Sequence, residues 1–185
     1  MRQLLTVLSA IVLLAYPFAV YLGINKFGLQ TVGILLACIF GLRIVAGQQA
    51  KIQELKQLAW ISGLIGLTLA LLGIVFKQHG WLLFYPVVVN VCMLSVFALS
   101  LKQKQTIIER LARLQEPDLP QSGIAYTRTV TKVWCVYFIF NGVIALFTCF
   151  QSIEIWTLYN GLISYLLAGA IFAGEWLVRQ KIRQS

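Results

Sequence analysis

The apolar residues of this chain are gathered into six long runs, which constrain its fold more than any other feature. Each run approaches the ~20 residues that a helix needs to cross ~30 Å of hydrocarbon. Because a backbone in lipid must satisfy its own hydrogen bonds, such runs are expected to be helices. The sequence therefore predicts an all-α, polytopic transmembrane bundle that forms a single domain over residues 1–185. The predicted spans are residues 4–24, 31–46, 58–76, 81–101, 133–150 and 157–178.

The composition supports membrane insertion and argues against a soluble domain. Of the 185 residues, 59% are hydrophobic and 11% are charged, whereas about 25% of residues in soluble domains are charged. The net charge of +9 would also suit a nucleic-acid-binding protein, but the cations are dispersed through short loops and tails. We therefore expect them to orient the spans and to contact membrane lipids, with no nucleic-acid partner.

The distribution of cations predicts the orientation of the spans. With the N-terminus inside, thirteen of the fifteen Lys and Arg residues fall on the inner side. The outer loops then hold only Lys26 and Lys77. Because Lys and Arg are enriched in cytoplasmic loops, the N- and C-termini are both expected in the cytoplasm.

The longest predicted connection, residues 102–132, lies on the inner side and is predicted to contain a short amphipathic helix. Thr106 and Glu109 have the spacing of a capping box at the start of a helix, and Pro117 and Pro120 are expected to end it. An apolar stripe flanked by cations suits a helix that lies among lipid headgroups or packs on the inner face of the bundle. The stripe consists of Ile107, Ile108, Leu111 and Leu114.

Four cations of this connection are candidate contacts for an anionic lipid headgroup or an acidic partner protein. A basic surface attracts both kinds of anion electrostatically. The alternative is that this connection is only structural, as a short helix packed on the bundle. The four residues are Arg110, Arg113, Arg128 and Lys132.

Polar side chains inside the predicted spans need partners, because hydrocarbon offers none. Asn90 and Asn141 fall at similar depth in consecutive antiparallel spans, where their amides can pair. Tyr16 and Tyr165 also place polar atoms within spans. These four residues predict either a hydrogen-bonded seam that fixes helix pairing or a path for a lipid or another substrate. Pro86 predicts a bend one turn before Asn90.

Glu175 is the one carboxylate within a predicted span, about one turn from its inner end. Arg179 follows four residues later, so the two are predicted to form an ion pair across one helical turn. A proton-driven transporter would more usually carry an acid near mid-depth. The ion-pair interpretation is therefore favoured over proton coupling.

The sequence contains no recognisable catalytic, cofactor or metal motif. Its four cysteines fall within predicted spans without a CxxC pair, and the chain has one histidine. Neither a disulfide framework nor a metal site is therefore expected. No nucleophile lies next to a base, and no paired carboxylates are present. We expect a protein that is not an enzyme and that needs no cofactor.

Five segments carry a resemblance to known proteins: residues 85–90 (YPVVVN), 108–120 (IERLARLQEPDLP), 126–128 (YTR), 132–134 (KVW) and 141–142 (NG). Through them the chain resembles, over most of its length, an uncharacterised bacterial inner-membrane family. That family is often encoded beside fatty-acid-synthase-like genes, including those for aryl polyene lipids. From residue 58 onward the chain is also distantly similar to intracellular septation protein A. The resemblance implies a bacterial inner-membrane location and a role in the cell envelope, but no particular reaction.

Three functions are compatible with these features. The first is a non-enzymatic membrane component of envelope or lipid assembly that docks cytoplasmic, fatty-acid-type biosynthetic proteins or anionic headgroups through residues 102–132. The second is a lipid transporter or flippase that uses the polar seam, and the third, least supported, is an intramembrane enzyme.

Small residues such as Ala15, Ala19 and Gly23 suit close packing within the bundle or in a homodimer.

The predicted orientation can be tested with a reporter enzyme that is active only in the periplasm. Fused after Lys77, the reporter should be active, because this residue is predicted on the outer side. Fused after Gln115, it should be inactive, because that residue lies in the inner connection. Activity is measured in intact cells and normalised to the amount of each fusion. The reverse pattern would overturn the orientation.

Overall fold

The computed structural model describes residues 17–18, 20–23, 28, 30–42, 44–45, 53–77 and 80–184. Among these residues there is no strand, so the described part of the chain is all-helical. Four helices are long and apolar enough to cross a membrane, which identifies a membrane protein: Ala59–Phe76, Gly80–Ser100, Gln121–Thr148 and Ile153–Gln180. A shorter apolar helix covers Gln30–Leu42.

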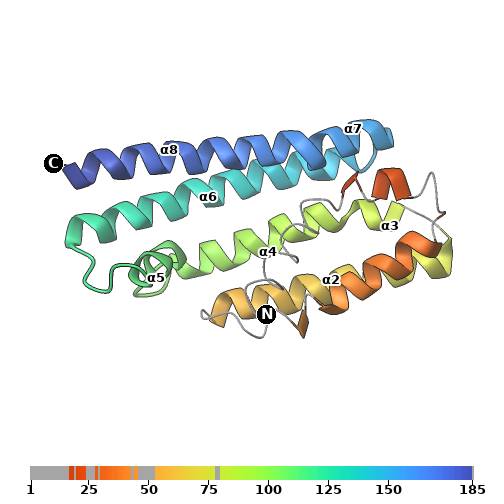
Figure 1. Cartoon of the computed structure of the whole chain (residues 1–185), viewed down its shortest axis with the longest axis horizontal. Coiled ribbons are helices and arrows are strands. Elements are labelled where there is room, and N and C mark those ends of the chain that lie inside the picture. Colours follow the sequence, from red (N-terminus) through yellow and green to blue (C-terminus); the bar gives the residue numbers. More distant parts are fainter. Residues whose placement is uncertain are drawn as a thin grey trace.

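The long helices form an antiparallel bundle (Figure 1). α4 packs between α2 and α6, and α8 packs on α6. The C-terminal end of α8 lies at the same end of the bundle as α5 (Figure 1). The elements are α2 (Gln53–Phe76), α3 (Gly80–Leu83), α4 (Tyr85–Ser100), α5 (Ile107–Arg113), α6 (Gln121–Thr148), α7 (Ile153–Leu158), the π-helical turn η1 (Tyr159–Ile163) and α8 (Ser164–Gln184).

From residue 58 onward, each predicted span coincides with a long apolar helix, but the first and last residues of these helices differ from the prediction. The predicted span 31–46 overlaps the shorter helix Gln30–Leu42, and most of the span 4–24 lies outside the described residues. The arrangement with six spans therefore stays a prediction.

The largest difference is at the start of α6, which begins at Gln121 and not at residue 133. Pro120 provides an extended backbone just before the helix. The next residues include Arg128 and Lys132, whose charges lower the local hydropathy without preventing helix formation. At 1.5 Å per residue, the 28 residues of α6 extend to roughly 42 Å. The first turns of α6 can therefore project beyond a hydrocarbon layer of ~30 Å.

The bend predicted at Pro86 is present as a break between α3 and α4. Phe84 stands between the two helices, and Pro86 occupies the first turn of α4. The carbonyl oxygen of Leu83 accepts hydrogen bonds from Trp156 Nε1 at 3.0 Å and from Cys149 Sγ at 3.1 Å. The break is therefore stabilised by side chains from the C-terminal half of the chain.

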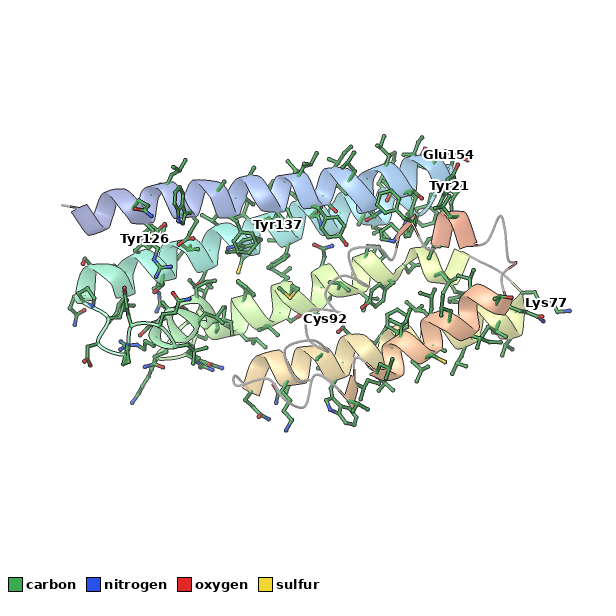
Figure 2. All side chains as sticks on the ribbon, in the orientation of Figure 1. Tyr21, Lys77, Cys92, Tyr126, Tyr137 and Glu154 are labelled. Atoms are coloured by element: carbon green, nitrogen blue, oxygen red, sulfur yellow. The ribbon has the colours of Figure 1, made fainter. Side chains whose placement is uncertain are left out.

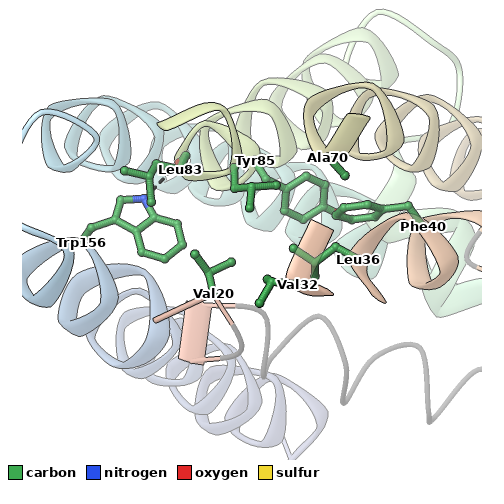
Figure 3. Packing of buried hydrophobic residues seen from close by; sticks show 9 residues of the cluster. Val20, Val32, Leu36, Phe40, Ala70, Leu83, Tyr85 and Trp156 are labelled. Carbon is green, nitrogen blue, oxygen red and sulfur yellow. Dashed lines mark hydrogen bonds between the residues drawn. The ribbon is translucent and has the colours of Figure 1, made fainter. Parts of the chain in front are cut away.

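Two apolar clusters lie along the bundle. The first surrounds the break between α3 and α4, where Trp156 points towards Leu83 and the rings of Phe40 and Tyr85 lie 4.6 Å apart (Figure 3). The second joins α4, α5 and α6 near the other end. It consists of Phe97, Ile107, Val130, Trp134, Cys135 and Phe138.

α4 and α6 approach closely at Gly142. A Cβ atom added there would lie 3.2 Å from the Cβ of Asn90. The absence of a side chain at Gly142 thus brings the two helices close enough for polar side chains to meet between them.

Candidate functional site

A hydrogen-bonded network of side chains lies between α4, α6 and η1. Asn141 Nδ2 donates to Asn90 Oδ1 at 3.0 Å, as the sequence predicts for these two amides. The hydroxyl of Tyr159 donates to Asn141 Oδ1 at 2.8 Å. Asn90 Nδ2 donates to the carbonyl oxygen of Pro86 at 2.8 Å. Both asparagines are buried, so the network satisfies groups that lipid could not.

The π-helical turn η1 brings adjacent polar residues to the same side. Tyr159, Asn160 and Gly161 are all buried within it, because a π-helical turn shifts the register of the residues that follow. While Tyr159 contacts Asn141, Asn160 Nδ2 donates to Thr148 Oγ1 at 3.0 Å and to the carbonyl oxygen of Trp156 at 2.9 Å. Neither Tyr159 nor Asn160 was predicted from the sequence as a site residue, although an amide inside an apolar span was a signal for Asn160.

The other predicted members of the polar seam are placed differently. Tyr16 lies outside the described residues, and Tyr165 lines the same cavity as Asn90 and Asn141. Tyr137, which the sequence analysis did not single out, donates through its hydroxyl to the carbonyl oxygen of Ser164 at 2.8 Å. Figure 2 shows Tyr137 between α6 and α8.

A cavity of about 580 Å³ lies over this network. Its lining comes mainly from α4, α6 and α8, and residues of α5 contribute at one end. Most of the lining is apolar, including Met93, Phe138 and Ala168, while Asn90 and Asn141 provide polar groups. Its volume and mixed lining are typical of small-molecule sites, which measure roughly 300–1,000 Å³.

A second cavity of about 470 Å³ lies between α5, α6 and α8. Its charged lining residues are Glu116, Glu175 and Arg179. The hydroxyl of Tyr126, also in the lining, donates to the backbone carbonyl of Glu175 at 2.9 Å. Figure 2 places Tyr126 towards the α5 end of the bundle. This cavity can therefore offer both signs of charge to a polar ligand.

Glu175 and Arg179 both line this cavity, one helical turn apart on α8. The predicted ion pair between them stays a prediction. The salt bridge that the structure describes joins Glu109 to Arg113 at 2.9 Å.

The connection between α4 and α6 is held by caps and by cations. Thr106 Oγ1 accepts from the backbone N–H of Glu109 at 3.3 Å, as the capping box predicts. Ser100 Oγ accepts from the backbone N–H of Ile107 at 3.1 Å. Ile107 itself is fully buried against the second apolar cluster. α5 is therefore fixed to the bundle at its N-terminal end.

Three of the four cations predicted to contact a partner also hold this connection. Arg113 pairs through Nε with buried Glu109 at 2.9 Å and donates to the carbonyl oxygen of Pro117 at 2.7 Å. Arg128 Nη2 donates to the carbonyl oxygen of Leu101 at 2.7 Å, and Arg110 donates to Gln103. A guanidinium has five N–H donors, so one arginine can hold more than one group of the connection, as Arg113 does.

Lys132, the fourth, is exposed, and its ammonium has no hydrogen-bond or ion-pair partner among the described residues. The same holds for Lys102 and Lys104. These three lysines can be changed without breaking a contact that the structure describes.

Comparisons of the chain with protein-family models, curated proteins and solved structures gave no match.

The contribution of the asparagine pair can be measured with a double-mutant cycle. Asn90→Leu and Asn141→Leu should each lower the free energy of unfolding by about 1–2 kcal/mol, because interhelical hydrogen bonds in membranes contribute about 0.6 and at most about 1.7 kcal/mol. Asn141→Leu should cost more, since Tyr159 also loses its acceptor. Unfolding is followed by circular dichroism during denaturant titration in mild detergent.

Ser95→Ala is the control, because Ser95 Oγ bonds only to a carbonyl of its own helix among the described groups. It should change stability by less than about 0.5 kcal/mol. Strictly additive effects of the two Asn substitutions would show that the pair contributes no coupling.

Proposed function

We propose that this protein is a non-enzymatic integral membrane component of cell-envelope or lipid assembly that docks acidic cytoplasmic proteins. In this proposal the chain crosses a bacterial inner membrane six times, with both termini in the cytoplasm and α5 at the headgroup level. The observation that supports it is the accumulation of exposed cations at the α5 end of the bundle.

Three exposed lysines supply these cations. Lys102 and Lys104 follow α4, and Lys132 lies in the N-terminal half of α6. Figure 2 shows Lys77 and Glu154 at the opposite end of the bundle. A surface with an excess of one sign of charge attracts partners of the other sign and accelerates their association. Acidic carrier proteins of fatty-acid-type synthesis have the required charge.

The docking proposal predicts that reversing the available lysines weakens binding. A triple variant should bind purified acyl-carrier protein with roughly tenfold lower affinity, since each exposed charge pair contributes about 0.2–1 kcal/mol. It combines Lys102→Glu, Lys104→Glu and Lys132→Glu. Binding to the full chain in nanodiscs is measured by biolayer interferometry. Raising the salt concentration should weaken the wild-type interaction in the same direction.

Lys77→Glu serves as the control, because this lysine lies at the opposite end of the bundle. It should leave the affinity unchanged. No binding by the wild type, or equal binding by the triple variant, would contradict docking of this carrier through the lysines.

A second candidate function is lipid transport, which the cavity of about 580 Å³ over the asparagine network favours. Polar groups at mid-depth beside an apolar cavity can accommodate a headgroup that crosses the membrane. However, the same groups already satisfy one another, which is sufficient for a structural role.

Transport can be tested in vesicles that contain a fluorescent phospholipid. If the protein moves lipid between leaflets, dithionite should bleach nearly all of the fluorescence, whereas it bleaches about half in protein-free vesicles. Asn141→Leu should slow the bleaching, and Ser95→Ala should not. Identical bleaching with and without protein would exclude the activity for that lipid.

A further inference from the structure

The two cavities described above share a wall and differ in polarity. Ile108, Leu111, Trp134 and Phe172 line both of them. The rings of Trp134 and Phe172 are in contact, with centroids 4.6 Å apart. An apolar cavity along the middle of the bundle thus lies directly beside a charged cavity at its α5 end. This is the polarity of an amphiphile that has its headgroup at the membrane surface.

The apolar cavity has the place and the lining to hold a hydrocarbon chain. It borders on α4 from Tyr85 to Phe97, a distance of about 18 Å at 1.5 Å per residue. Ala168, Leu111 and Phe172 are all apolar members of its lining. The helices α4, α6 and α8 that flank this cavity belong to segments of membrane-spanning length. A hydrocarbon chain in the cavity would therefore lie parallel to the lipid chains around the protein.

The charges of the inner cavity determine which headgroup fits. It carries two carboxylates, Glu116 and Glu175, and one guanidinium, Arg179. A guanidinium binds phosphate oxygens through paired N–H donors. A carboxylate accepts hydrogen bonds from a primary ammonium. A headgroup that carries a phosphate and a primary ammonium is therefore complementary to this cavity.

We propose that the two cavities together bind one aminophospholipid, with an acyl chain in the apolar cavity and its headgroup in the charged one. Arg179 holds the phosphate and Glu175 accepts from the ammonium. A glycerol headgroup brings no cation to the carboxylates, and a choline headgroup has no N–H to donate. The lipid site goes beyond the proposed docking of proteins, because Lys102, Lys104 and Lys132 line neither cavity.

Lipid binding is measured by native mass spectrometry of the full chain in mild detergent. Dioleoyl phosphatidylethanolamine, phosphatidylglycerol and phosphatidylcholine are titrated separately. The phosphatidylethanolamine adduct should form with at least threefold higher affinity than the other two. Arg179→Gln and Glu175→Gln should each lower its affinity about fivefold, and Lys77→Gln, which removes a charge at the opposite end of the bundle, should not.

Two variants of α8 test whether an acyl chain occupies the apolar cavity. Ala168 lines the apolar cavity, so Ala168→Phe should fill it and lower the affinity at least fivefold. Ala170, two residues further along α8, is exposed and lines neither cavity. Ala170→Phe should therefore bind phosphatidylethanolamine as the wild type does. Thermal unfolding of each variant shows whether the bundle is intact.

Two results would overturn the proposal. Equal affinities for the three lipids would mean that only non-selective lipid coats the bundle. Equal binding by Ala168→Phe and Ala170→Phe would mean that the apolar cavity is not the site. Either result leaves the test with acyl-carrier protein unaffected, so the two proposals can fail separately.

Discussion

The structure depends on one constraint: a polar group between packed helices in lipid must find its partner within the protein. Asn90, Asn141 and Tyr159 satisfy this constraint together, through side chains from three elements. The close approach at Gly142 makes their contact geometrically possible. A few hydrogen bonds therefore specify which helices pair in this region. Apolar packing alone would distinguish poorly between one helix and another, because the surrounding lipid is also apolar.

Burial within the protein imposes a similar requirement at the α5 end, where charged groups take the place of amides. Buried Glu109 is paired with Arg113, and Arg128 satisfies a carbonyl oxygen at the end of α4. Guanidinium groups thus have a structural role in the connection between α4 and α6, whereas the exposed lysines around them have none that the structure describes. This division separates the cations that shape the surface from those available to a partner.

The sequence was sufficient to predict the helical class, the long apolar helices after residue 58, the cap at Thr106 and the Asn90–Asn141 contact. Each follows from hydropathy or from spacing within one or two helices. It was not sufficient for the start of α6, because Arg128 and Lys132 lower the local hydropathy although they lie within a regular helix. It also did not reveal η1, because a π-helical turn arises from tertiary contacts and not from local preference. The two cavities depend on how α4, α5, α6 and α8 pack together, which no spacing rule describes.

The carbonyl oxygen of Leu83 accepts two hydrogen bonds from residues that are synthesised much later than Leu83 itself. Its carbonyl oxygen belongs to an early hairpin, while both donors, Cys149 and Trp156, belong to a late one. Chains emerge from the ribosome N-terminus first, at about 5–20 residues per second. The 73 residues between Leu83 and Trp156 correspond to roughly 4–15 seconds at that rate. During synthesis the carbonyl oxygen of Leu83 therefore lacks these two donors until the C-terminal hairpin has been made, so the break between α3 and α4 is completed late.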